Sequence, residues 1–247
     1  MLHRPVQLKR RQAVSRRELR IVVLASFVLA VGLSARPAPA QSGKSPYPNM
    51  APVEQYLMDH DAEIAFARTA APASISGAAD VLVMTRKGYE TAVKGKNGFV
   101  CLVERAWMAS FDNAEYWNPK NRSPICFNPP GARTILPFVY MKTELALTAK
   151  SNVEIRDRLK DALAKKELPT PELGAMCYMM SKNAYLTDGD GHNLAHLMFW
   201  VPAADRAALG ADLPGSPIML FNDDPEPIGG FIVATGMWSD GTPAPLM

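Results

Sequence analysis

The stretch VLVMTRKGYETAVKGKNGFVCLVERAW, residues 81–107, decides the fold class. It contains three β-rich runs separated by two short turn segments: 81–86, 89–94 and 99–107, with Lys87-Gly88 and Gly95-Lys96-Asn97-Gly98 between them. Asn-Gly before a β-rich run favours a hairpin, because both residues tolerate positive φ. The stretch therefore predicts a three-stranded antiparallel meander.

Helical patterns flank this stretch. One pattern begins at Pro52, ends before Pro72 and has an apolar face with three- and four-residue steps: Val53, Leu57, His60, Ile64 and Ala67. A second helix begins at the capping box of Ser151 and Glu154, and its apolar stripe is Ile155, Leu159, Ala162 and Leu163. Between the two, residues 108–130 predict an irregular loop, and Pro137 leaves residues 131–149 ambiguous.

The last third of the chain again contains β-rich runs typical of strands. Four runs predict strands at 175–180, 194–201, 218–221 and 231–237, with one short helix at 203–209. The order α, βββ, α, ββββ fits neither βαβ alternation nor an all-β fold. We expect an α+β fold with a mostly antiparallel sheet and two main helices, in a single compact domain over residues 52–247.

The N-terminal 40 residues have the three parts of a secretory signal peptide. Seven basic residues between Arg4 and Arg20 precede the uncharged apolar run 21–35, and an Ala-x-Ala site ends at Ala40. The apolar run of 15 residues is shorter than the roughly 20 that span a bilayer, so we expect cleavage and no permanent membrane span. Residues 41–51 then form a flexible lead, and the mature protein lies in a bacterial periplasm or is secreted.

The export route is indicated by the basic segment. Residues 15–19, Ser-Arg-Arg-Glu-Leu, partly match the twin-arginine pattern. Arg20 stands where that pattern usually has an apolar residue. We therefore expect the general secretory (Sec) route.

Cleavage changes the charge of the protein. Residues 1–40 contain eight Lys and Arg and one Glu, which leaves 19 basic and 23 acidic residues and a formal net charge of −4. A mildly acidic domain offers no electrostatic surface for nucleic acid or anionic lipid. Nucleic acid is therefore excluded as a partner, whereas a small molecule or a metal ion is not.

A polar loop carries the candidate metal ligands. Asp188, Asp190, His192 and His196 lie within nine residues, and the two histidines share one face of either a helix or a strand. Imidazole and carboxylate groups could hold one divalent metal ion. An exposed Asp-Gly turn beside a core histidine is the alternative, and the register excludes an EF-hand because Leu186 and Leu197 fall at the terminal ligand positions.

The chain has three widely spaced cysteines, Cys101, Cys126 and Cys177. In an oxidising compartment an odd number indicates one disulfide and one buried or reactive thiol, with the pairing left open.

The leading functional hypothesis is a small-molecule or metal-binding module, and two other hypotheses compete with it. One is a hydrolase-like enzyme that uses a metal-activated water or Cys126 as nucleophile, and the other is a structural or partner-binding protein of the cell envelope.

Four blocks of the chain resemble a group of exported bacterial proteins that has no assigned activity. The blocks are residues 97–105, 123–130, 174–182 and 196–199. The resemblance implies that these blocks are parts of one domain, and it transfers no catalytic residue.

Overall fold

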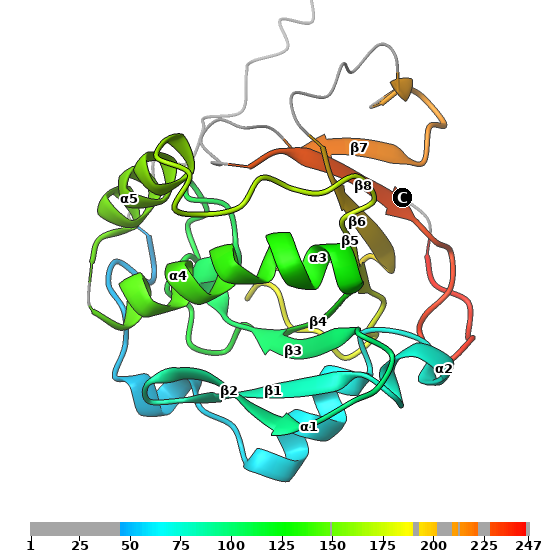
Figure 1. The fold of residues 1–247 in the computed structure, drawn as a ribbon, viewed down its shortest axis with the longest axis horizontal. Helices are drawn as coiled ribbons and strands as arrows, with labels where there is room; N and C mark the ends of the chain where they lie inside the picture. The colour runs from blue at the N-terminus through cyan, green and yellow to red at the C-terminus, as the bar shows by residue number, and fades with distance from the viewer. Residues whose placement is uncertain are drawn as a thin grey trace, which may run out of the picture. The chain divides into compact units, whose positions relative to one another are not determined.

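Eight strands form one mixed sheet in the order β2-β1-β3-β4-β5-β6-β8-β7 (Figure 1). The strands are β1 (Asp80–Thr85), β2 (Gly88–Val93), β3 (Val100–Glu104), β4 (Ser123–Phe127), β5 (Met176–Met179), β6 (His196–Trp200), β7 (Ile218–Phe221) and β8 (Gly230–Ala234). Neighbouring strands are antiparallel, except that β1 and β3 are parallel. A mostly antiparallel sheet with separate helices makes the fold α+β, as the sequence predicts.

The computed structural model describes residues 45–148, 150–189, 193–201, 209–211, 213–221 and 228–245. Within these ranges the α-helices are α1 (His60–Arg68), α2 (Ala73–Ser76), α3 (Pro129–Thr134), α4 (Leu136–Leu147) and α5 (Asn152–Ala164), and the 3-10 turns are η1 (Val53–Tyr56) and η2 (Ala106–Met108). The prediction of two main helices was therefore incomplete. Pro137 does not break α4 because it lies in the first helical turn, where its missing N–H has no helical acceptor.

The predicted meander is wrong at its third strand. β1 and β2 form the expected hairpin, but β3 lies on the other side of β1 and runs parallel to it. The chain between β2 and β3 crosses the start of β1, and the Lys96 N–H donates to the Ala78 carbonyl at 2.8 Å. Gly95 permits this crossing, because a Cβ there would lie 2.3 Å from the Ala79 carbonyl carbon. The glycine-rich segment is a crossover rather than a hairpin turn.

The predicted irregular loop 108–130 contains a central strand. β4 pairs with β3 along its whole length and with β5 only at Cys126 and Phe127. Pro124 is tolerated in β4 because its missing N–H falls beyond the short ladder with β5. Because proline is rare in central strands, the sequence pattern did not predict β4.

The first helix is shorter than predicted and begins at His60. The Asp59 side chain caps it by accepting hydrogen bonds from the N–H groups of Asp61 and Ala62, and η1 is a separate turn. The His60 side chain is 61% exposed, so its assignment to the apolar face of this helix was wrong. By contrast, the capping box of Ser151 and Glu154 at the start of α5 is confirmed.

Helices cover the two faces of the β1–β3–β4 part of the sheet (Figure 1). α1 packs on β1, β3 and β4, while α4 contacts β2 and packs against α5, and α3 contacts β4 and β5. A buried ion pair joins α1 to the end of β3, where Nη2 of Arg105 lies 2.7 Å from Oε1 of Glu63. The same Glu63 oxygen accepts a hydrogen bond from the Met84 N–H in β1.

Some predictions fall outside the described residues. These are the signal peptide, the first part of the flexible lead up to residue 44, and residues 203–208 of the predicted short helix. None of the helices within the described ranges is long and apolar enough to cross a membrane. The strands predicted at 175–180, 194–201, 218–221 and 231–237 correspond to β5 to β8.

Candidate ligand cavity

The candidate site is built around Glu104, the last residue of β3. Side chains alternate along a strand, so Glu104 shares the α4 side of the sheet with Leu102. The Glu104 side chain is only 8% exposed, and no described residue forms a hydrogen bond or an ion pair with its carboxyl group. Burial raises the pKa of Glu104 to about 8, although the charge of Lys142 opposes this shift. The carboxyl group is therefore mostly protonated at pH 7.

An apolar chamber of about 200 Å³ lies on this face of the sheet, between the strands and α4. Most of its wall is aliphatic and aromatic, and its polar members are Glu104, Ser110 and Lys142. The remaining lining residues are Met108, Ile125, Phe127, Ile135, Phe138, Val139, Met198, Trp200, Phe221, Ile228 and Ile232. The chamber can accept an apolar chain or ring.

A polar chamber of about 330 Å³ adjoins the first. Glu104, Met108, Ser110 and Met198 line both chambers, so the two share a boundary. The other lining residues of the polar chamber are Arg105, Ala106, Ala109, Asn113, Asn121, Arg122, Ser123, Met179, Leu186 and His196. One cavity thus has an apolar end and a polar end, with Glu104 at the junction.

Arg122 borders the polar chamber, but the alternation of side chains along β4 places its guanidinium on the α1 side with Cys126. Its Nη1 donates to the carbonyls of Pro119 and Asn121, and its Nη2 donates to the Gln55 carbonyl. No ion pair of Arg122 occurs among the described residues. Burial lowers the pKa of Arg122 to about 10, so the guanidinium is still charged at pH 7.

Lys142 brings a second positive charge to the apolar chamber. Its Nζ lies 3.9 Å from the centroid of the Phe111 ring and donates to the Ala109 carbonyl at 3.2 Å. The residue is 1% exposed and comes from the middle of α4. The aromatic ring and the carbonyl hold the ammonium group in place beside the cavity.

Of the predicted metal ligands, the structure brings His196 into the polar chamber. Nδ1 of His196 lies 2.7 Å from the Leu194 carbonyl oxygen, which can only accept, so Nδ1 carries the proton of the neutral ring and Nε2 is an acceptor. Burial lowers the pKa of His196 below its ordinary value. The ring is therefore neutral at pH 7.

Asp188 joins a different set of groups. Its carboxylate accepts hydrogen bonds from Tyr185 Oη at 2.5 Å, from Lys120 Nζ at 2.9 Å, and from Tyr47 Oη. These bonds hold the pKa of Asp188 well below its usual range. Asp188 thereby ties the loop before β6 to the loop before β4 and to the segment around Tyr47.

The metal prediction is only partly covered by the structure, because Asp190 and His192 lie outside the described residues. Within the described ranges, no group of three or more His, Cys, Asp or Glu side chains could hold a metal ion. His196 and Asp188 therefore do not form part of such a group in the described part of the chain.

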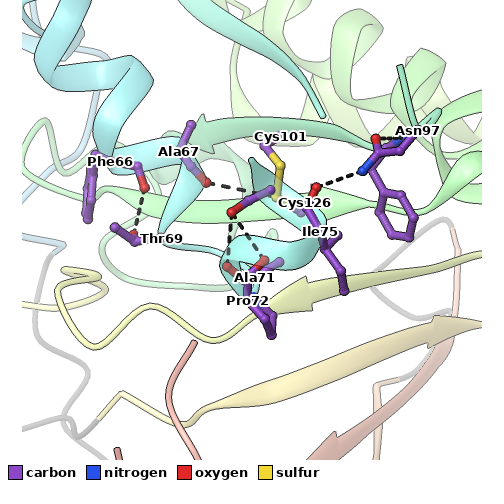
Figure 2. The surroundings of a disulfide bond; sticks show 11 residues. Phe66, Ala67, Thr69, Ala71, Pro72, Ile75, Asn97, Cys101 and Cys126 are labelled. Carbon is purple, nitrogen blue, oxygen red and sulfur yellow. Dashed lines mark hydrogen bonds between the residues drawn. A yellow bond between two sulfur atoms is a disulfide. The ribbon is translucent and has the colours of Figure 1, made fainter. Parts of the chain in front are cut away.

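The cysteines divide between the two faces of the sheet. Cys101 of β3 and Cys126 of β4 are directly opposed and form a disulfide on the α1 side (Figure 2). The Cys126 sulfur lies 4.0 Å from the Ala67 carbonyl oxygen of α1. Cys177 is a free thiol buried on the α4 side, and burial raises its pKa well above the usual value. Neither Cys126 nor Cys177 offers an exposed thiolate.

The sequence analysis missed Glu104 and Arg122 as site residues. A signal for Glu104 was present, because the alternation of Val100, Leu102 and Glu104 predicts an acidic side chain on the apolar face of a strand. Arg122 lies in a proline-rich segment that was interpreted as a loop, so no periodicity pointed to it.

Comparison of the chain with protein-family models, curated proteins and solved structures finds no match. Functional inference therefore rests on the residues of the cavity and on their chemistry.

Proposed function

We propose that this protein is an exported binding protein that holds a small amphipathic molecule in the cavity between the sheet and α4. The observation that carries the proposal is the pair of adjoining chambers, one apolar and one polar, with Glu104 at their boundary. Ligand sites in proteins typically combine an apolar wall with a few fixed polar groups that orient the ligand.

The state of Glu104 supports a ligand rather than a purely structural role. A buried polar group without a hydrogen-bond partner costs stability, and native proteins contain few of them. Glu104 is largely buried, its carboxyl group has no hydrogen bond with a described residue, and it borders both chambers. A ligand that hydrogen-bonds to the carboxyl group removes this cost on binding.

The cavity supports a small molecule better than a metal ion or a thiol-dependent reaction. Among the described residues, the polar chamber is lined by one Glu and one His, Glu104 and His196, and by no Asp or Cys. The sulfur of Cys126 is in the disulfide on the opposite side of the sheet, so it cannot act as a nucleophile on a molecule in the cavity.

Export is supported by two independent features. Residues 1–40 have the pattern of a signal peptide. The disulfide between Cys101 and Cys126 fits an oxidising compartment, because cytosolic thiols are kept reduced.

Calorimetric titration of the purified protein with three eight-carbon probes, 1-octanol, octylamine and octanoate, tests the binding proposal. At least one probe should bind one to one. Met198→Trp should weaken this binding by at least about tenfold, because Met198 borders both chambers. Leu197→Trp is the matched control, since Leu197 is the neighbouring residue of β6 and points to the other face.

A second pair of variants guards against misfolding of the tryptophan variants. Ile232 of β8 lines the apolar chamber, whereas Val233 faces the opposite side. Ile232→Phe should therefore weaken probe binding and Val233→Phe should not. Absence of binding of all three probes to the wild type, or equal binding by both members of each pair, would refute the proposed function.

A further inference from the structure

We propose that β5 and β6 form a binding site for a soft monovalent metal ion, copper(I), and that its ligands are Cys177, Met179, His196 and Met198. The inference goes beyond the proposed function, because it concerns a sulfur-rich site on the sheet rather than the small molecule in the cavity. It also differs from the predicted divalent metal site, with which it shares only His196.

The four side chains form a square on two neighbouring strands, β5 and β6 (Figure 1). Cys177 lies directly opposite Met198, and Met179 lies directly opposite His196. Residues two apart on a strand share a face, so all four lie on the α4 side, where Cys177, Met179 and Met198 pack in one cluster with Val139. Directly opposed residues have Cβ atoms about 5 Å apart. The donor atoms, which lie one to three bonds beyond Cβ, can therefore converge on one ion.

The donor atoms of this square are mostly sulfur. They comprise one thiol, two thioethers and one imidazole nitrogen. Soft sulfur ligands of this kind select copper(I), whereas calcium and magnesium prefer oxygen. Among the described residues no metal-binding group of three consists of His, Cys, Asp and Glu alone, so the site depends on its two methionines. Methionine is unbranched and adapts its side chain readily, which suits a ligand that must adjust to the ion.

His196 already has the arrangement of a metal ligand. Its Nδ1 donates to the Leu194 carbonyl at 2.7 Å, which leaves the lone pair of the neutral ring on Nε2. Histidines that bind metals typically donate their other N–H to a carbonyl or carboxylate, because this bond fixes the ring and its tautomer. His196, Met179 and Met198 also line the polar chamber, which provides an entry path for the ion.

The charge of the site favours a monovalent ion. Cys177 is 0% exposed, and it binds a metal ion as the thiolate, with its proton released to solvent. Copper(I) and one thiolate together carry no net charge, so the buried site stays neutral. A divalent ion would leave one uncompensated positive charge on the buried strands, which is costly.

Anaerobic titration of the purified protein with copper(I), in competition with the chromophoric chelator bicinchoninate, tests the site. One equivalent of copper should bind. Met179→Leu removes one sulfur at nearly constant volume and should weaken copper binding at least about tenfold. Met176→Leu is the matched control, because Met176 belongs to the same strand and faces the opposite side, so its affinity should equal that of the wild type.

Proton release gives a second readout at the thiol. In a weakly buffered solution at pH 7, the wild type should release one proton for each copper bound, whereas Cys177→Ala should release none. X-ray absorption of the copper-loaded protein should show sulfur ligands together with one imidazole, and His196→Phe should lack the imidazole. Absence of one-equivalent binding, or equal affinity in Met179→Leu and Met176→Leu, would refute the inference, because copper held by the thiol alone does not depend on Met179.

Discussion

The two faces of β3 and β4 differ sharply, although alternate residues of the same two short strands form them. On the α1 face, Val81, Cys101, Val103 and Cys126 pack against alanines of α1 and the following turn, and the disulfide links the two strands (Figure 2). On the α4 face, Leu102 and Ile125 are followed by Glu104 and Ser123, which border a cavity. One face is closed and cross-linked, whereas the other keeps open space and a carboxyl group that bonds to no other described residue.

The buried cations also differ in how their charge is compensated. The buried cation that points toward α1, Arg105, has its carboxylate partner in Glu63, and the two side chains are 0% and 1% exposed. Arg122, which lies on the α1 side with Cys126, has none among the described residues. The closed face thus contains an ion pair formed within the chain, whereas the cavity face contains Glu104 and Ser123, which a second molecule can contact. Four experiments test this difference between the two faces.

The largest effect is expected from Arg105→Met. Removal of the guanidinium leaves the Glu63 carboxylate buried without its cation, which costs roughly 3–5 kcal/mol of unfolding free energy. Arg122→Met breaks no ion pair with a described residue and should cost about 1–2 kcal/mol through lost hydrogen bonds. Urea unfolding of both variants measures the difference. Equal losses would contradict the stabilising role of the buried ion pair.

The disulfide should contribute somewhat less. It closes a loop with a sequence separation of 25 residues, so Cys101→Ala/Cys126→Ala should lose about 3 kcal/mol of unfolding free energy. Cys177→Ala is the control on the cavity face, where loss of one buried sulfur should cost about 1 kcal/mol. Thermal unfolding with and without reductant provides the measurement. A reductant effect on the double variant would show that the assigned bond is not the one responsible.

Glu104 should make the protein less stable as the pH rises from 6 to 8. The folded protein keeps the Glu104 proton up to a pKa of about 8, whereas the unfolded chain releases it near the ordinary Glu pKa of 4.5. The unfolded state therefore binds fewer protons in this window, and unfolding free energy should fall by about 2 kcal/mol. Glu104→Gln should lack this decrease. His196 contributes equally to both proteins, so their difference isolates Glu104, and parallel pH profiles would contradict its buried state.

The smallest change in melting temperature is expected from Asp188→Asn. Asp188 lies near the surface, where the loss of an ion pair with Lys120 has little effect on stability. Its hydrogen bonds nevertheless hold the loop that carries Arg122 and the rest of the polar wall. Affinity for the eight-carbon probe that binds should therefore fall several-fold while the melting temperature hardly changes. Calorimetric titration and thermal unfolding of the same sample compare the two effects, and a large thermal effect without loss of affinity would contradict this role.

Local patterns determined part of this fold. The hairpin of β1 and β2, the capping box at Ser151 and the strands β5 to β8 follow from alternation, turn residues and capping chemistry, which act over a few neighbouring residues. The α+β class follows from the order of these elements. The same patterns predict a signal peptide over residues 1–40, and three cysteines predict one disulfide without identifying its partners.

Only the tertiary structure decided which strands are neighbours and which side chains meet. The parallel pairing of β3 with β1 depends on a crossover at Gly95, and the insertion of β4 between β3 and β5 brings Cys126 opposite Cys101 and Ser123 opposite Glu104. These contacts join residues far apart in the chain, so no short window of sequence records them. The buried state of Glu104 likewise depends on residues far from it in the chain, such as Lys142 of α4 and Met198 of β6, which line the cavity with it. Burial and electrostatics are properties of that packing, and for this reason the sequence contained the residues of the cavity without revealing the cavity itself.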